Sequence, residues 1–144
     1  MVKKVVESFN VEYLQVMDEN GIVDKELMPK LSDKQIKEFY ETMILLRAFD
    51  DKSFNMQRQG RIGTYIQYKG QEASQLGSAK VLNDDDWMFP MYRSGAALIV
   101  RKHPMHKLLQ YGGGDIRGLK TTEKVNNFPI SIAVGTQSPH AVGC

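Results

Sequence analysis

The residues most suited to chemistry lie between positions 57 and 93. This stretch holds Gly60 and Gly63 beside Arg58 and Arg61, with small polar side chains between two helical patterns. Backbone N–H groups of a glycine loop and guanidinium groups can converge on an anion, so the stretch favours a phosphate site. Alternatively, the arginines complement a helix dipole, and the glycines end a helix and form a turn. Spacing alone leaves both interpretations open.

Four short blocks occur in one order along nearly the whole chain. They read Gln-Arg-Gln-Gly-Arg-Ile-Gly-Thr-Tyr at residues 57–65, Gly-Gln-Glu-Ala at 70–73, Phe-Pro-Met-Tyr-Arg at 89–93 and Val-Gly-Thr-Gln-Ser-Pro-His-Ala at 134–141. Together they resemble the N-terminal part of the alpha subunit of the decarboxylating component of 2-oxo acid dehydrogenase complexes, most like the pyruvate type. The resemblance implies an α/β fold: the N-terminal portion of a thiamine-diphosphate-binding fold, helix-rich and with a truncated parallel sheet.

The resemblance also implies which residues bind the coenzyme, thiamine diphosphate. Tyr92 and Arg93 match the pair that grips the diphosphate, a task suited to a guanidinium fork. Ile132 and Val134 match positions whose backbone groups hold the aminopyrimidine ring. The alternatives are a buried tyrosine beside a surface arginine, and a plain core strand.

Two further sets of residues follow from the same resemblance. Tyr65 and Ile66 match a loop that approaches the substrate pocket, where mammalian pyruvate-type subunits carry a histidine in place of Ile66. Ser131, Thr136 and Gln137 match positions that surround a potassium ion in branched-chain relatives. A capping role for Thr136 and Gln137 remains an open alternative.

The family's magnesium ligands are absent from this sequence. They belong to a Gly-Asp-Gly motif followed by a later Asn, expected beyond Cys144, while Gly114-Asp115-Ile116 lacks the second glycine. The family's activating glutamate comes from the beta subunit, and none of the three histidines is expected to be catalytic. We therefore expect no catalytic residue in the chain, and no activity from the 144 residues alone.

The function implied is part of an enzyme that decarboxylates a 2-oxo acid oxidatively, with pyruvate expected, and transfers the acyl group to a lipoyl group. The implied partners are the beta subunit, in a heterotetramer, and the lipoyl acyltransferase core. The alpha subunits of branched-chain 2-oxo acid and acetoin dehydrogenases share these motifs and remain alternatives. A different alternative is a non-catalytic or split-subunit interaction module that uses its long helix to bind a partner.

Composition narrows the class of protein. With 144 residues, 42% hydrophobic and 25% charged, the chain suits one modest globular domain. A net charge of +2 gives no reason to expect nucleic acid as a partner. Cys144 is the single cysteine, and the apolar runs are too short for a membrane span or a signal peptide. We expect a cytoplasmic protein that does not bind membranes.

Residues 1–31 are expected to form an arm and a hairpin around Asn20-Gly21, and residues 32–144 the incomplete coenzyme-binding domain. Apolar residues at steps of three and four predict a helix from the N-cap Ser32 to about Gln59. Shorter helices are expected at about 70–82, 96–100, 104–111 and from 138. We also expect a strand at 87–89, a flexible loop at 115–127, and a solvated basic helix face formed by residues 101–103 and 106–107.

Overall fold

The computed structural model describes residues 2–121 and 125–144. The chain divides into two compact units, Met1–Asp33 and Lys34–Cys144, and each is described by itself. In the first unit, Met17 and Val23 form an antiparallel bridge, and the turn between them contains Gly21 with φ +79°. Glycine adopts this angle without steric cost, which suits the turn predicted around Asn20-Gly21.

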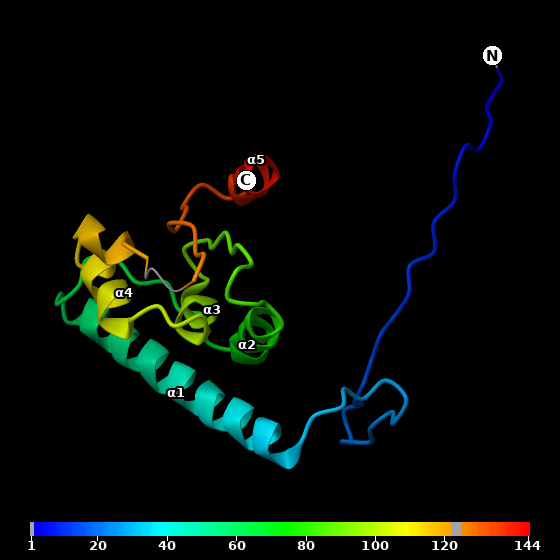
Figure 1. Ribbon diagram of the computed structural model, residues 1–144, viewed down its shortest axis with the longest axis horizontal. Coiled ribbons are helices and arrows are strands. Elements are labelled where there is room, and N and C mark those ends of the chain that lie inside the picture. Colours follow the sequence, from blue (N-terminus) through cyan, green and yellow to red (C-terminus); the bar gives the residue numbers. More distant parts are fainter. Residues whose placement is uncertain (1, 122–124) are drawn as a thin grey trace. The chain divides into compact units, whose positions relative to one another are not determined.

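The second unit consists mainly of helices (Figure 1). They are α1 (Asp33–Arg58), α2 (Glu72–Lys80), α3 (Gly95–Val100), α4 (Met105–Gly112), the 3-10 helix η1 (Ile116–Leu119) and α5 (Gln137–Gly143). All five predicted helices are confirmed, with ends that differ by one or two residues. Within the described part of the chain, no helix is long and apolar enough to cross a bilayer.

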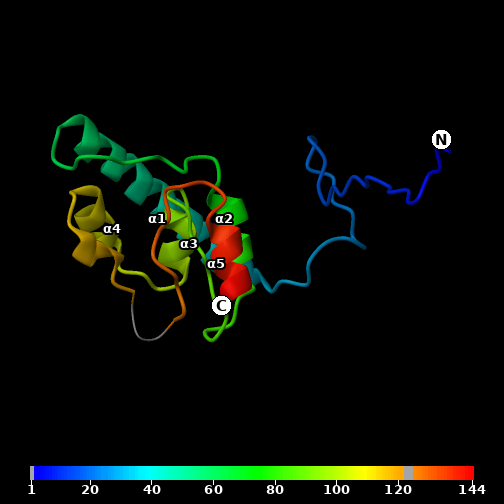
Figure 2. The same ribbon diagram turned by 90° about the horizontal axis from the view of Figure 1, so that it is seen from above.

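The core lies between α1 and α3. Leu46, Tyr68 and Ala96 form a buried cluster, and Phe49, Ile99 and Val100 pack against it. Both views show α3 lying against the middle of α1 (Figures 1 and 2). The predicted apolar face of α1 is therefore buried around Leu46, whereas its first member, Ile36, is 44% exposed.

The expected parallel sheet is not formed in the described residues. The segment predicted as a strand, 87–89, is reduced to a parallel bridge between Met88 and Asn127, and a second bridge joins Met91 to Ser131. Pro90 lies between the two bridged positions of its segment and has no N–H to donate. Pairing is consequently confined to isolated bridges, with no continuous ladder.

The basic segment after α3 was wrongly predicted to be solvated. Arg101 and His103 are each only 4% exposed. The Arg101 guanidinium donates to the Asn127 side chain at 3.1 Å and to the carbonyls of Asn83 and Asp86 at 2.7 and 2.6 Å. These three oxygen acceptors compensate for removing the guanidinium group from water. Burial also lowers the pKa of His103, whereas His106 is exposed as expected.

The segment 115–127 was predicted to be a flexible loop, and its first part is instead the helix η1. The Asp115 carboxylate accepts from the Arg117 backbone N–H at 3.0 Å and closes the first turn. Gly118 is buried against α4, so closely that a Cβ would lie 2.4 Å from the Lys107 carbonyl oxygen. Close packing thus anchors a segment that has no apolar periodicity. Residues 122–124 of the predicted loop lie outside the described residues.

Candidate functional site

A cavity of about 660 Å³ lies in the second unit. Its walls come from α1, from the loop before α2, from the start of α3, from α4 with the glycines after it, and from the segment before α5. The residues are Phe49, Gly63, Thr64, Tyr65, Ile66, Tyr68, Tyr92, Gly95, Leu108, Tyr111, Gly112, Gly113, Gly114, Ile130 and Ile132. Aromatic, aliphatic and glycine residues dominate this lining, which suits a ligand with flat apolar rings.

Two of the predicted phosphate-loop glycines have structural tasks instead. Gly60 has φ +70° and ends α1, since its N–H donates to the Gln57 carbonyl at 2.9 Å. The Gly63 N–H donates to the Gly112 carbonyl at 2.9 Å and so ties the cavity loop to the end of α4. Arg61 is exposed. At this loop the structure therefore supports the helix-end and turn interpretation over a phosphate loop.

Tyr92 and Arg93 have different positions relative to the cavity. Tyr92 lines it, whereas Arg93 is not among the lining residues. The Arg93 side chain is half-buried, and its Nη1 donates to the Gln67 carbonyl. Its own carbonyl accepts from the Gln75 side chain at 3.0 Å. Contacts of its side chain and of its backbone therefore hold Arg93 next to the cavity loop.

Tyr65 and Ile66 both line the cavity. The Tyr65 hydroxyl donates to the Asp50 carboxylate at 2.8 Å. Burial, together with this hydrogen bond, raises the pKa of Tyr65, so its hydroxyl stays protonated at neutral pH. Tyr65 is consequently a fixed hydrogen-bond donor rather than a base, and Ile66 gives an apolar wall.

Ile132 lines the cavity, whereas Val134 does not and is 74% exposed. Among the described residues, no hydrogen bond involves the backbone N–H or carbonyl of either residue. The two backbone positions predicted to hold a ring are thus available for a ligand, but only Ile132 borders the cavity.

The three residues predicted around a potassium ion come together in one loop. The hydroxyl groups of Ser131 and Thr136 are hydrogen-bonded to each other. The Gln137 side chain donates to the Ser131 carbonyl at 3.2 Å and accepts from the Gly135 N–H at 3.0 Å. These contacts support the loop internally. No group of three His, Cys, Asp or Glu side chains suited to a metal ion exists in the described part of the chain.

Two carboxylates near the cavity loop escaped the sequence prediction. Asp50 is fully buried, and Glu72 forms an ion pair with Arg47 while accepting from the Gly70 N–H at 2.9 Å. The hydrogen bond from Arg47 lowers the pKa of Glu72 to about 2. The sequence signal for Asp50 is its spacing, because it lies four residues after Leu46 on the apolar face of α1.

Residues 40–144 match the dehydrogenase E1 component family. The chain belongs to this family. Over 133 residues, 92% of its length, it is 37% identical to a Staphylococcus aureus protein named pyruvate dehydrogenase E1 component subunit alpha. Proteins of the same name from Bacillus cereus and Staphylococcus epidermidis are 36% and 35% identical over the same length. The chain spans 36% of the length of each of these relatives.

Membership of the dehydrogenase E1 component family confirms the resemblance that the four sequence blocks carried. The family match covers all four blocks, since it runs from residue 40 to residue 144. The relatives also bear the pyruvate name, in agreement with the type predicted.

Proposed function

We propose that this chain forms the N-terminal, coenzyme-facing part of the alpha subunit of a thiamine-diphosphate-dependent pyruvate dehydrogenase E1 component. One observation carries the proposal. Tyr65, Ile66, Tyr92 and Ile132, all selected from sequence, border a single cavity of about 660 Å³. The similarity to relatives named pyruvate dehydrogenase E1 component subunit alpha supports the choice of pyruvate.

The lining of the cavity fits the ring end of the coenzyme. Two planar rings match the apolar and aromatic walls. The backbone groups of Ile132, unpaired among the described residues, offer a hydrogen-bond donor and an acceptor at the edge. When bound, thiamine diphosphate supplies the electron sink for decarboxylation. Ile66 and Ile132 give the cavity apolar walls, and Tyr65, held by Asp50, fixes its shape.

Arg93 suits the diphosphate end. Its guanidinium group has five N–H donors, and the contact with the Gln67 carbonyl uses Nη1. The remaining donors can form charge-assisted hydrogen bonds with phosphate oxygens. Tyr92 precedes Arg93 in the sequence, and its hydroxyl group adds a neutral hydrogen-bond donor. In this assignment Arg93 binds and orients the coenzyme and takes no part in proton transfer.

The rest of the assembly completes the site. The loop formed by Ser131, Thr136 and Gln137 is assigned to a potassium ion that steadies the ring-binding segment. The isolated bridges at Met88 and Met91 are parallel, which supports a parallel arrangement of these two segments. Magnesium ligands come from outside the described residues, a beta subunit supplies the activating glutamate, and a lipoyl acyltransferase core accepts the acyl group. We propose that this assembly works in the cytoplasm.

The test uses the protein produced from its own gene in its own host, purified with its partner. The assay follows reduction of an artificial electron acceptor with thiamine diphosphate and magnesium present. Pyruvate, a branched-chain 2-oxo acid and acetoin are compared. We expect kcat/KM for pyruvate to be higher by about tenfold or more, since one methylene group in an apolar pocket changes this ratio by roughly 10- to 200-fold.

The outcomes separate the alternatives. A preference for the branched-chain acid or for acetoin would transfer the chain to one of those relatives. No coenzyme-dependent turnover with any of the three compounds would support a non-catalytic interaction module and would refute the proposal.

A further inference from the structure

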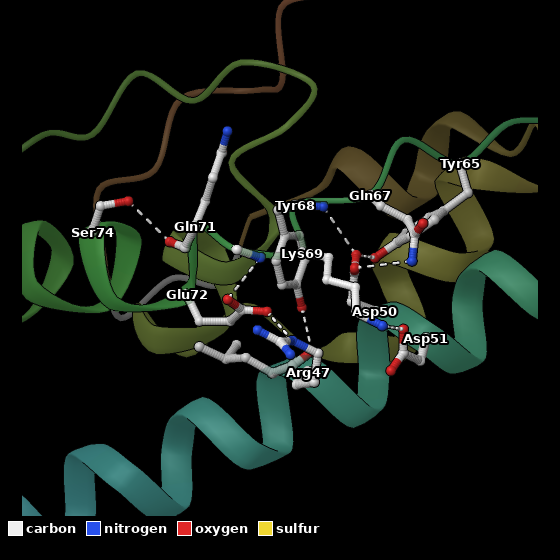
Figure 3. A network of polar contacts seen from close by, with 12 residues as sticks. Arg47, Asp50, Asp51, Tyr65, Gln67, Tyr68, Lys69, Gln71, Glu72 and Ser74 are labelled. Carbon is white, nitrogen blue, oxygen red and sulfur yellow. Dashed lines mark hydrogen bonds and ion pairs between the residues drawn. The ribbon is translucent and has the colours of Figure 1, made fainter. Parts of the chain in front are cut away.

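Asp50 is a buried carboxylate on α1, and in the described part of the chain its side-chain hydrogen bonds all come from one short segment. It is fully buried, and no Lys, Arg or His side chain in the described residues forms an ion pair with it. Its Oδ1 accepts from the Tyr65 hydroxyl at 2.8 Å and from the Tyr68 backbone N–H at 3.1 Å. Its Oδ2 accepts from the Gln67 side chain at 3.3 Å. Figure 3 shows the three donors converging on Asp50.

This carboxylate contacts three of the four residues of the segment 65–68 and helps to hold the segment against α1. Removing a carboxylate from water is costly unless hydrogen bonds compensate, and here three nearby residues donate to it. Two further polar contacts join α1 to residues 68 and 69. The buried Tyr68 hydroxyl donates to the Leu46 carbonyl at 2.9 Å, and Asp51 contacts Lys69 at 2.9 Å with both side chains about half exposed. An exposed ion pair of this kind contributes little to stability.

The segment held by Asp50 is also the segment that meets the site. Tyr65 lines the cavity, and the Gln67 carbonyl accepts from Arg93. The side chain of Gln67 therefore contacts α1 while its backbone contacts the guanidinium group proposed to bind phosphate. A shift of residues 65–68 would move a cavity wall and release Arg93 together.

We propose that Asp50 is a positioning residue, which holds the segment 65–68 so that Tyr65 borders the cavity and Arg93 is aligned for the coenzyme. The proposal rests on the proposed function, because it gives the segment a role in coenzyme affinity. A purely structural role for Asp50 would affect the whole fold. The positioning role instead predicts that only the segment 65–68 loosens and that affinity for the coenzyme falls.

The test variant is Asp50→Asn, and the control is Asp51→Asn. The amide of asparagine has the shape of the carboxylate, but it turns one acceptor into a donor that faces other donors. Hydrogen exchange is measured by mass spectrometry on the purified protein without added coenzyme. Since a hydrogen bond to a charged group is lost, exchange at residues 65–69 should accelerate about 10- to 100-fold in Asp50→Asn. Exchange in α4 should change less than about twofold.

The second measurement is the thiamine diphosphate concentration that gives half-maximal turnover. We expect Asp50→Asn to raise this concentration about tenfold and to lower kcat at saturation less than about threefold, since Asp50 does not border the cavity. Asp51→Asn should match the parent in both measurements. Tyr65→Phe, which keeps the ring and removes one of the three donors, gives a milder variant that should show a smaller shift in the same direction if Asp50→Asn fails to fold.

Three results would overturn the proposal: unchanged exchange at residues 65–69, equally faster exchange throughout the second unit, or an equal effect from Asp51→Asn. Failure of the proposed function looks different. In that case the turnover of the parent protein would not depend on thiamine diphosphate. The role of Asp50 in coenzyme affinity would then be refuted as well, even if hydrogen exchange at residues 65–69 still differed between Asp50→Asn and Asp51→Asn.

Discussion

Replacing Arg93 by alanine removes a guanidinium group from the edge of the cavity loop. In the folded chain its Nη1 donates to the Gln67 carbonyl, and its backbone carbonyl accepts from Gln75 at 3.0 Å. The substitution leaves the contact with Gln75 in place, because that contact uses the backbone. The fold should therefore lose only about 1 kcal/mol, the typical net contribution of one hydrogen bond.

The effect on coenzyme affinity should be larger. A hydrogen bond to a charged group contributes roughly 1.5 to 3 kcal/mol, which corresponds to about a 10- to 100-fold weaker affinity for thiamine diphosphate. Turnover at saturating coenzyme should fall much less, because Arg93 is assigned to the diphosphate and not to the reacting ring. Arg93→Lys keeps the charge and loses the fork, so its affinity should lie between those of the parent and Arg93→Ala.

The assay is the thiamine diphosphate concentration that gives half-maximal turnover, measured in the assembled protein. Arg61→Ala is the matched control, since Arg61 is an exposed arginine just beyond the glycine that ends α1. It should leave this concentration unchanged. An unchanged value for Arg93→Ala, or a larger shift for Arg61→Ala, would show that the diphosphate is bound by a different arginine.

Three substitutions test the packing around the site by thermal unfolding. Gly118→Ala should destabilise the fold by about 1 to 3 kcal/mol, since its Cβ would lie 2.4 Å from the Lys107 carbonyl oxygen. Gly77 lies on α2, and a Cβ there would meet no atom within 4 Å, so Gly77→Ala should stabilise the fold by about 0.5 to 1 kcal/mol. The reverse order would refute this packing. Glu72 has a folded pKa lowered from 4.5 to about 2, so its charge stabilises the fold above pH 4.5, and this contribution is lost as the pH falls toward 2. The parent should therefore lose about 1 to 2 kcal/mol more stability than Glu72→Gln over this range, and equal slopes would contradict the ion pair with Arg47.

The helices of this chain could be predicted because their signals are local. The spacing of Phe39, Met43, Leu46 and Phe49 marks one face of α1, and Gly60 ends the helix with a positive φ. The strand at 87–89 could not be judged in this way. Whether a strand forms depends on partners elsewhere in the chain, and here Pro90 interrupts the pairing.

The family resemblance selected Tyr65, Ile66, Tyr92 and Ile132, which border one cavity, and their roles in binding stay predictions. The glycines after α4 were not predicted as a wall, because only tertiary packing brings them to the cavity loop. For the same reason Arg101 was misjudged: its burial depends on carbonyls in a turn 15 to 18 residues earlier. The burial of Asp50 could have been predicted, because its spacing from Leu46 puts a carboxylate on the apolar face of α1.

The direct test of the coenzyme assignment is a calorimetric titration of the assembled protein with thiamine diphosphate in the presence of magnesium. Ile132→Trp adds bulk to the wall of the cavity, and Val142→Trp is the control, since Val142 is 90% exposed and does not line it. We predict about micromolar binding by the parent and by Val142→Trp, and binding at least about tenfold weaker by Ile132→Trp. Equal affinity in all three proteins would contradict the assignment of the coenzyme to this cavity.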